Sequence, residues 1–575
     1  MSKNSLVSSI LEELADYTEM EDDQPYRARA YRRAAQTIKS IEEDIEQIAK
    51  EGNLKEIPGI GDAIEKKIKE ILETGKLTSL DKLKQSTPVD VASLTKVEGI
   101  GPKTVKDLYR QLQIKNLEEL ESAIKEGRLA DFRGLGIKDP KILLERIQNA
   151  KLQSNRVLLV EAENIVKRVK VELDKIKGIS RYEIAGSFRR KKETIGDLDV
   201  LVETDSPEVV VQNFTKIDEV KEVMLAGDYK ASVKFAKNFQ VDLRVVPSKS
   251  WGAALLYFTG SKAHNIELRT RALRKKCHLN EYGLFKEDNE TMVAGASEEQ
   301  VYSALDMDYI EPELRENRGE IALAEERKLP DLIERKDIKG DLQMHTTWSD
   351  GSESIDSMAS EAIKLGYEYI AITDHIGSLK IANALDVARI KEQKKEISKL
   401  NDGYEKEGKK FRILQGAEVN IKADGTLDMP NSVLKEIEIV LASIHSGFKD
   451  DISKIMMRFT GAFENENVDI IAHPSGRLIL ERTGYAFDLD EMIEKSLQTE
   501  TILEIDAYPN RLDLSDENAF QALKAGCMLS IDTDSHASSE LTYMDGGVEQ
   551  ARRAWATRKQ ILNTKSYSEL VKYLA

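Results

Sequence analysis

The chain has 575 residues, of which 41% are hydrophobic and 33% are charged, as is ordinary for a soluble globular protein. This length exceeds what a single hydrophobic core can organise, and we expect about three to five domains. The net charge of -17 does not exclude a nucleic-acid partner, because binding depends on local surfaces and basic side chains cluster at residues 27–33, 189–192 and 269–276.

The cysteine pattern and the N-terminal segment indicate the compartment. Cys277 and Cys527 are far apart and form no CxxC pattern, which excludes a disulfide framework and a zinc finger and fits a reducing cytosol. Residues 1–20 carry acidic side chains where a signal peptide is apolar, and no apolar run is long enough to cross a bilayer. We therefore expect a soluble, cytoplasmic protein with no membrane partner.

Helices are expected over residues 5–50, where apolar residues recur at a spacing of three to four. One of them begins at Pro25, a favoured residue of the first helical turn, and carries the basic and aromatic residues 26–33. These side chains could face a DNA backbone, and a solvated helix face is the alternative.

A glycine turn then recurs along the chain. The sequence IPGIG lies at residues 57–61, VEGIG at 97–101 and a weaker copy, FRGLG, at 132–136, and each precedes a helical run. A Gly-x-Gly turn that opens a helix points backbone N–H groups at an anion. Repeated between helices it is the helix-hairpin-helix element, which binds DNA phosphates without reading sequence. The glycines expected at this contact are Gly59, Gly61, Gly99 and Gly101.

Lys67 lies on the helix after the first glycine turn, with Lys66 and Lys69 beside it. A solvated surface lysine is one interpretation. The other is a nucleophile: if its surroundings lowered its pKa, Lys67 could form a Schiff base with a sugar aldehyde.

Short strands are expected from residue 181 onward, and one of them carries a pair of carboxylates. Asp197 and Asp199 lie two apart in an apolar run, so on a strand both side chains point to the same face. Burying such a pair is costly unless a cation compensates it, and paired oxygen ligands suit Mg²⁺ or Mn²⁺. The turn at Gly186 and Ser187 precedes the basic residues 189–192, an arrangement that holds a polyphosphate beside a metal pair.

Two later segments extend this site. Asp242 lies in the apolar strand expected at 240–246, and a neighbouring strand could bring it to the carboxylate pair, where three carboxylates can hold two divalent metals. The alternative for Asp242 is a surface salt bridge to Arg244. Tyr257 and Phe258 precede a Thr-Gly-Ser turn and are either a nucleotide-binding pair or an ordinary pair of core aromatic residues.

Residues 1 to 315 resemble the family X DNA polymerases, the family of DNA polymerase beta. The resemblance rests on GSFRR, GDLDVLV, VDLRVV, YFTGS and LNEYGLF, which occur in the family's order. It implies that Asp197, Asp199 and Asp242 are catalytic metal ligands, that Arg269 approaches the template, and that Lys67 is at the deoxyribose-phosphate lyase position. It also implies a nucleotide site formed by Gly186, Ser187, Arg190, Gly196, Tyr257, Phe258, Gly260 and Asn265.

The chain departs from this family at two places. Lys191 replaces the glycine that usually follows the arginines of the GSFRR segment. Ala63 and Lys66 replace polar neighbours of the lyase lysine, which leaves the lyase activity open.

The C-terminal third changes to short apolar strands alternating with helices, which predicts a β/α barrel. Polar residues recur where these strands end, and five of the seven histidines of the chain lie at such positions. Ligands at the ends of successive parallel strands converge at one end of the barrel. Mixed imidazole and carboxylate ligands suit Zn, Mn or Fe, which activate water for phosphoester hydrolysis.

Residues 337 to 575 resemble the polymerase and histidinol phosphatase (PHP) domain, which implies a distorted (βα)7 barrel with a trinuclear metal site. The usual opening His-x-His is here Gln343-Met344-His345, and a neutral amide is a weak ligand for a transition metal. The residues that match the ligand positions of this domain are His345, Asp350, His375, Glu418, His445, His473, Asp534 and His536.

We therefore expect a multidomain protein that combines α+β and α/β parts. The expected domains are a helical lyase-like domain at 1–85, a fingers-like helix-hairpin-helix domain at 86–150, a catalytic palm at 151–250, a thumb-like domain at 251–315, a linker at 316–336 and the PHP barrel at 337–575.

The expected function is that of a repair DNA polymerase that fills short gaps with Mg²⁺ or Mn²⁺, while the PHP site, with Mn²⁺, Zn²⁺ or Fe, hydrolyses 3′-terminal phosphodiesters. Gapped or primer-template DNA and dNTPs are the expected partners of a monomeric prokaryotic protein associated with the nucleoid. The alternatives are a nucleotidyltransferase with another acceptor, a PHP nuclease or phosphatase with a silent polymerase half, and a DNA-binding scaffold without activity.

Overall fold

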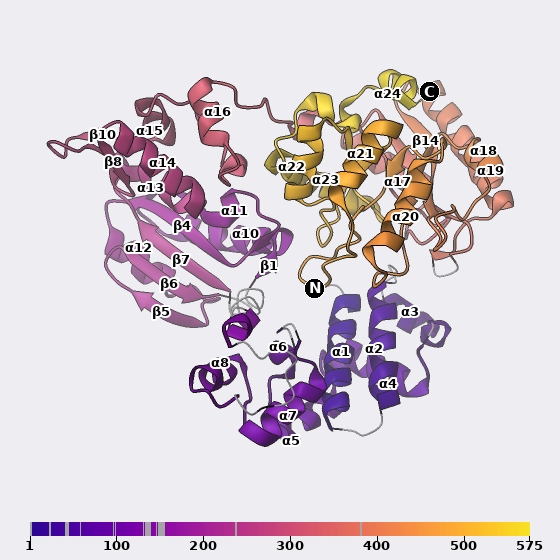
Figure 1. Ribbon diagram of the computed structural model, residues 1–575, viewed down its shortest axis with the longest axis horizontal. Helices are drawn as coiled ribbons and strands as arrows, with labels where there is room; N and C mark the ends of the chain where they lie inside the picture. The colour runs from indigo at the N-terminus through magenta and orange to yellow at the C-terminus, as the bar shows by residue number, and fades with distance from the viewer. Residues whose placement is uncertain are drawn as a thin grey trace. The chain divides into compact units, whose positions relative to one another are not determined.

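The computed structural model describes residues 3–21, 25–40, 45–57, 59–95, 97, 99–129, 132, 140–144, 146–147, 156–235, 239–379 and 382–574. The chain divides into two compact units, Met1–Asn155 and Arg156–Ala575 (Figure 1). Among the described residues, no helix combines the length and the apolar character that crossing a bilayer requires. Most of the third glycine turn (133–136) and the expected boundary at 150/151 lie outside the described residues.

The first unit is helical, as its sequence predicts. Helix α1 packs against α2, α4, α5 and α7, and Leu11, Ile68 and Leu108 in their shared core are fully buried. Its helices include α1 (Lys3–Glu21), α2 (Pro25–Ser40), α3 (Ile45–Glu51), α4 (Asp62–Thr74), α5 (Thr78–Ser86), α6 (Val91–Leu94), α7 (Pro102–Leu112) and α8 (Leu117–Lys125).

The second unit begins with the five-stranded palm sheet. Its strand order is β2-β4-β7-β6-β5, and only the central pair β4 and β7 is parallel. Apolar residues of helices α10 and α12 pack against it. The bounds are α10 (Leu159–Lys175), β2 (Ile179–Ile184), β4 (Asp197–Thr204), α12 (Pro207–Phe214), β5 (Glu222–Ala226), β6 (Lys230–Lys234) and β7 (Gln240–Val245), and outside the sheet β1 (Val157–Leu158) pairs with β3 (Thr194–Ile195).

The sequence predicted every strand of this sheet except β5. All five residues of β5 are exposed at the edge of the sheet, so the strand lacks the alternation of apolar and polar residues that marks a half-buried strand.

The thumb-like domain packs helices on a three-stranded sheet. Its elements are α13 (Trp251–Thr259), α14 (Lys262–Arg274), β8 (Cys277–Asn280), β9 (Gly283–Lys286), β10 (Met292–Ala294) and α15 (Glu298–Ala304). The segment expected as a linker contains α16 (Glu320–Glu326), which buries Ile321 and Ala324 in the thumb core, whereas Ile333 is buried in the core of the barrel. Both ends of this segment are therefore fixed by packing.

The C-terminal domain is the predicted barrel of parallel strands, in the order β11-β12-β14-β15-β16-β17-β18. A bridge between Met344 and Ser535 links the two outer strands just beyond their ends, and the His345 N–H donates to the Ser535 carbonyl at 2.8 Å. The strands are β11 (Gly340–Asp341), β12 (Tyr369–Ile372), β14 (Arg412–Asn420), β15 (Ile439–Ser443), β16 (Ile470–Ile471), β17 (Ile502–Asp506) and β18 (Leu529–Asp532), and β13 (His375–Ile376) pairs with β14.

Helices surround this barrel, as expected for alternating strands and helices. They are α17 (Ile355–Lys364), α18 (Val387–Lys406), α19 (Asn431–Leu434), α20 (Ile452–Phe463), α21 (Leu489–Thr499), α22 (Asp516–Ala525), α23 (Met544–Arg553) and α24 (Tyr567–Leu574). The predicted combination of helical, α+β and α/β parts is confirmed.

A buried carboxylate joins the palm to the thumb. Glu298 accepts hydrogen bonds from Arg189 at 2.6 and 2.9 Å and from the fully buried Arg315 at 2.6 Å. Burial alone would raise the pKa of Glu298, but the charges of Arg315 and Arg189 lower it to about 2. The carboxylate therefore stays ionised while it is buried.

We expect Glu298→Gln to lower the free energy of unfolding by about 3–5 kcal/mol, because it leaves the buried guanidinium of Arg315 and the partly buried one of Arg189 without their anion. Since the folded-state pKa lies below the ordinary value of 4.5, this stabilisation is present above pH 4.5 and is lost as the pH falls toward 2. Guanidinium denaturation at neutral pH measures the loss. Asp306→Asn, at an exposed ion pair with Lys275, is the control and should leave the unfolding curve unchanged.

Candidate active sites

The first site is built on the parallel pair of strands β4 and β7. Their register places Asp199 directly beside Asp242, and Asp197 lies two residues earlier on the same face of β4. The intervening Leu198 and the following Val200 point to the other face and are fully buried. The structure thus brings together the three carboxylates that the sequence had placed on two separate strands.

These carboxylates repel one another. Burial raises the pKa of Asp199 to about 7, and the charges of Asp197 and Asp242 add to the effect. Burial and the charge of Asp242 also raise the pKa of Asp197. Such a cluster is costly to ionise unless a cation neutralises it. A set of donors made of carboxylate oxygens fits Mg²⁺ or Mn²⁺.

A short helical turn, α11 (Gly186–Arg189), lies against the carboxylates. Gly186 has φ of +66°, and a Cβ atom there would lie 2.8 Å from Oδ2 of Asp199. Only glycine therefore allows the turn to approach so closely. Ser187 follows in the same turn, and a Cβ atom on Gly196 would lie 3.2 Å from the guanidinium of Arg156, which the sequence had not singled out.

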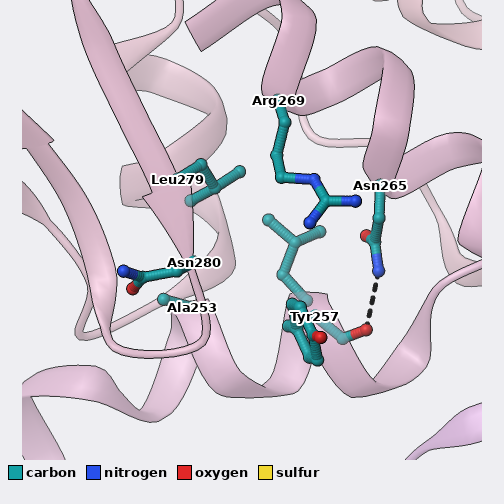
Figure 2. Close-up of a pocket in the computed structure, with 7 residues that line it drawn as sticks. Ala253, Tyr257, Asn265, Arg269, Leu279 and Asn280 are labelled. Atoms are coloured by element: carbon teal, nitrogen blue, oxygen red, sulfur yellow. Dashed lines mark hydrogen bonds between the residues drawn. The ribbon is translucent and has the colours of Figure 1, made fainter.

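A small cavity of about 10 Å³ lies in the thumb-like domain (Figure 2). Tyr257, Asn265 and Arg269 line it, and Nδ2 of Asn265 donates to the Tyr257 carbonyl at 2.7 Å. Asn280 on β8 also lines the cavity and was not predicted.

Two further residues of the predicted nucleotide pocket lie outside this cavity. Phe258 meets Tyr257 edge to face with 5.1 Å between ring centroids, and its own ring lies under the guanidinium of Arg244 at 4.7 Å. Gly260 ends α13 with φ of +69°. Arg244 therefore packs on an aromatic ring.

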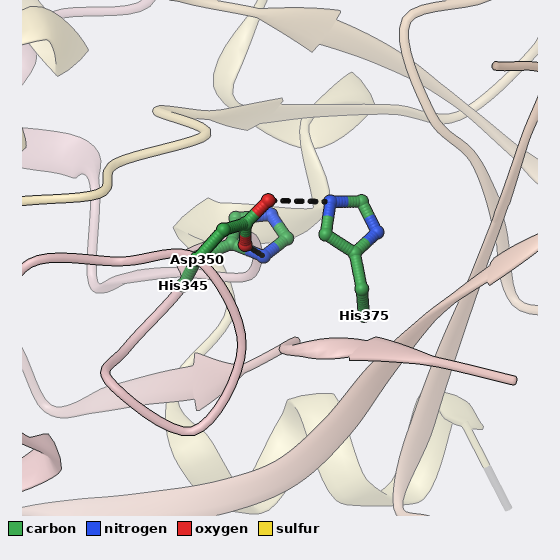
Figure 3. Close-up of side chains that lie close together, drawn as sticks. All are labelled: His345, Asp350 and His375. Atoms are coloured by element: carbon green, nitrogen blue, oxygen red, sulfur yellow. Dashed lines mark ion pairs between the residues drawn. The ribbon is translucent and has the colours of Figure 1, made fainter. Parts of the chain in front are cut away.

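The second site lies at the ends of the barrel strands. The predicted ligands follow successive strands: His345 follows β11, Glu418 lies on β14, His445 follows β15 and His473 follows β16. Because all strands are parallel, these side chains meet at one end of the barrel. Figure 3 shows His345, Asp350 and His375 close together.

Glu418 is central to this cluster. Its Oε1 lies 3.1 Å from Nε2 of His445 and 3.1 Å from Nε2 of His473, and its Oε2 lies 3.3 Å from Nε2 of His345 and 3.5 Å from Nδ1 of His375. Three groups of side chains in the described chain could each hold a metal ion, and together they include seven of the eight predicted ligands; His473 is in none of them. The groups are His345, Asp350 and His375; His345, Asp534 and His536; and His375, Glu418 and His445.

The electrostatics of this cluster also suit cations. Burial by itself would lower the pKa of His345, but hydrogen bonds to Asp534 and Glu418 raise it well above the ordinary value. Burial lowers the pKa of His536 to about 3, so this imidazole is neutral, as a metal ligand must be. Nδ1 of His473 is buried and makes no hydrogen bond with the described chain.

Gln343 lies inside the cluster despite its departure from the usual histidine. Its amide is fully buried between Glu418 and Asp534 on one side and Glu504 on the other. When the amide nitrogen donates to Glu504, the amide oxygen faces the ligand cluster and can serve as a hard oxygen ligand.

Two residues of this region were missed by sequence reasoning. Glu504 accepts a hydrogen bond from the His473 N–H at 2.6 Å, and the partly buried guanidinium of Arg511 lies 3.3 Å from Asp506 and 3.7 Å from Asp534. Arg511 lies outside any strand in an irregular segment, so no sequence period could have placed it in the site.

The two described glycine turns of the first unit have nearly the same geometry. Gly59 and Gly99 have φ of +94° and +90°. Gly61 and Gly101 immediately precede α4 and α7, with φ of -103° and -101°, and provide no side-chain cap. First-turn N–H groups at a helix end without a capping side chain are suited to a phosphate.

Lys67 is half-buried on α4. Its Nζ donates to Oγ of Ser79 at 2.9 Å and lies 5.8 Å from the centroid of the Tyr31 ring. Burial lowers the pKa of Lys67, which increases the fraction of the neutral amine.

Five family models match successive parts of the chain. They are a helix-hairpin-helix domain over residues 2–77, a SAM-like helix-hairpin-helix tandem over 91–148, the DNA polymerase beta palm over 156–226, the DNA polymerase beta thumb over 254–316 and a PHP domain over 341–570.

The chain is 38% identical over 576 residues to the DNA polymerase/3′-5′ exonuclease PolX of Bacillus subtilis (strain 168), with 100% of the chain and 99% of that protein covered. It is 27% identical over 341 residues to DNA polymerase lambda of Rattus norvegicus, with 54% of the chain and 56% of that protein covered. It is also 29% identical over 235 residues to a probable phosphatase of Thermoanaerobacter sp. (strain X514), with 39% of the chain and 89% of that protein covered.

We expect Mn²⁺ to raise the unfolding temperature of this protein, because binding to clustered carboxylates and imidazoles stabilises the folded state. Glu418→Gln should remove most of this increase at the barrel site. The measurement is thermal unfolding with and without Mn²⁺ in an Asp199→Ala background, which weakens the first site.

Asp424→Asn, on an exposed loop of the same barrel, is the control and should keep the full increase. An equal Mn²⁺ effect in the Glu418→Gln variant would contradict a metal site centred on Glu418.

Proposed function

The chain belongs to the family X DNA polymerases that carry a C-terminal PHP domain, and from this premise we propose how its residues divide synthesis and hydrolysis. The observation that carries the proposal is the register of β4 and β7, which places Asp199 beside Asp242 with Gly186 in contact. Asp197, Asp199 and Asp242 would hold the divalent ions, which activate the primer hydroxyl and stabilise the leaving pyrophosphate.

The residues around the carboxylates would bind the nucleotide. Arg190 and the N–H groups of the turn at Gly186 and Ser187 would hold the triphosphate of the dNTP. Gly196 permits the strand to pass close to this site. Tyr257 and Asn265, which share one cavity, would contact the sugar and base. Phe258 and Gly260 would shape the end of this pocket, and Arg269 would approach the template.

The N-terminal unit would bind the DNA. The two described glycine turns present helix N-termini with matching backbone geometry, and such turns bind phosphates without reading sequence. This supports gapped or primer-template DNA as the substrate and short-gap filling in repair as the role. We place the activity in the cytoplasm of a prokaryotic cell, at the nucleoid, in a monomeric protein.

The PHP site would hydrolyse the 3′-terminal phosphodiester. The predicted ligands of this site would hold Mn²⁺, Zn²⁺ or Fe, and Gln343 lies beside them. A bound ion supplies an activated water. The partly buried Arg511 lies beside Asp506 and Asp534 and would attract the phosphate of the DNA end. Mn²⁺ is the proposed activating ion, and the mixed set of imidazole and carboxylate ligands also suits Zn²⁺ or Fe.

We expect Asp199→Ala to abolish primer extension and to keep 3′ degradation, and His445→Ala to do the reverse. The measurement follows labelled gapped DNA with Mg²⁺ or Mn²⁺, with and without dNTPs. Each loss should be about 100-fold or more, because each substitution removes a metal ligand.

The matched controls are Asp205→Ala, just past the other end of β4, and His278→Ala, a histidine of the thumb-like domain; both activities should persist in each. Loss of both activities in both active-site variants would contradict two separate sites.

A lyase activity is a second candidate, and the burial of Lys67 favours it. Borohydride should trap the protein on DNA with a 5′-deoxyribose phosphate, and Lys67→Ala should abolish trapping. Lys69→Ala is the control, because this lysine is exposed and paired with Glu65 at 2.8 Å. Trapping that persists in Lys67→Ala would exclude Lys67 as the nucleophile.

A further inference from the structure

The turn proposed to bind the triphosphate contacts the barrel domain within the second unit. Three residues of the segment 190–193 bind barrel residues. The Arg190 carbonyl accepts from Nη1 of Arg553 at 2.5 Å, Nζ of Lys191 lies 2.5 Å from Oε1 of Glu549, and Glu193 accepts from Arg477 at 2.7 Å. Arg553 and Glu549 lie one turn apart on helix α23.

The buried Arg553 also holds the side-chain partner of Arg190. Nη1 of Arg553 donates to Oε1 of Glu316 at 3.1 Å, and the same oxygen accepts from Nε of Arg190 at 3.0 Å. Nη2 of Arg553 donates to Asp516 of the barrel at 2.7 Å. Arg190 is thus held at its carbonyl by the barrel and at its guanidinium by Glu316, and Arg553 contacts both points.

The contacts of Lys191 account for a lysine at the position where the family usually has a glycine. Its φ of +55° lies in the left-handed region, where glycine is favoured and a lysine side chain is strained. Such a conformation persists when surrounding contacts hold it. Here the partly buried ammonium bonds to Glu549, so the lysine that replaces glycine adds an ion pair to the barrel.

From these contacts we infer that Arg553, Glu549 and Lys191 are positioning residues for dNTP binding. The barrel domain forms part of the support of the polymerase nucleotide site, in addition to carrying its own site. The inference rests on the proposed role of Arg190 in binding the triphosphate. If the Arg190 side chain were flexible, it would lose conformational entropy when the nucleotide binds. Contacts that fix Arg190 beforehand avoid this entropic cost.

The test is steady-state gap filling with Mg²⁺ and varied dNTP concentration. We expect Arg553→Met and Glu549→Gln each to raise the KM for dNTP about 10-fold, the loss that follows from one hydrogen bond to a charged group, with kcat within about twofold. Lys191→Glu should raise the KM as well, and the exchanged pair Lys191→Glu with Glu549→Lys should restore most of the affinity.

Arg552→Met is the matched control. Arg552 is the neighbour of Arg553 on α23, and its Nε donates to Oε1 of Glu313 at 2.8 Å. In the described structure it makes no contact with the nucleotide-binding turn. Its KM for dNTP should stay unchanged. Hydrolysis of the 3′ end without dNTPs should persist in all variants, which shows that the barrel is folded. If Arg553→Met loses this hydrolysis, the KM values of Glu549→Gln and of the exchanged pair test the positioning role instead.

Arg190→Met distinguishes a failure of the positioning role of the barrel from a failure of the proposed role of Arg190 in binding the triphosphate. If this variant raises the KM but Glu549→Gln does not, or if Arg552→Met raises it equally, the positioning role of the barrel is overturned while the nucleotide site stands. If Arg190→Met itself leaves the KM unchanged, the proposed role of Arg190 is overturned, and the inference with it.

Discussion

Both sites of this protein concentrate more negative charge than their own side chains neutralise. In the palm, Asp197, Asp199 and Asp242 lie on one face of two adjacent strands, and burial and mutual repulsion raise the pKa of Asp199 to about 7. In the barrel, Glu418 lies among four imidazoles while further carboxylates surround them. Divalent cations would neutralise this charge, and three groups of side chains in the barrel could each hold a metal ion.

In both sites the backbone also approaches a carboxylate closely. Gly186 brings the turn against Asp199, where any side chain would collide with the carboxylate. In the barrel, the bridge between Met344 and Ser535 places His345 beside Asp534 and His536. In each case the backbone, rather than a long side chain, determines the distances between the residues of the candidate site.

The two catalytic domains are also linked mechanically. Glu298 joins the thumb to Arg189, and helix α23 of the barrel holds the two residues that follow. The contact of Arg189 with Glu298 is a mostly buried ion pair, which is costly to break by removing one partner, whereas Lys191 and Glu549 form a partly buried ion pair and Arg553 donates to a backbone carbonyl. The segment between the thumb and the barrel is likewise packed at both ends, so the second unit is held together by more than its covalent connection.

Local patterns in the sequence were sufficient for much of this structure. The spacing of Asp197 and Asp199, the glycine turns and the recurrence of histidines at strand ends each depend on a short period, and the structure confirms the strands, helices and barrel that they predicted. The edge strand β5 was not predicted, because its apolar residues are all exposed and do not alternate with polar ones. The third glycine turn lies mostly outside the described residues.

The sequence by itself determined the family and the face on which each candidate ligand lies, because these follow from residue type and from local periodicity. Only the tertiary structure decided that Asp242 lies beside Asp199, that the Gln343 amide lies between Glu418 and Glu504, that Arg511 lies beside Asp534 and that Lys191 meets Glu549. These contacts join residues far apart in the chain, and their geometry depends on strand register and domain packing, which no local pattern encodes.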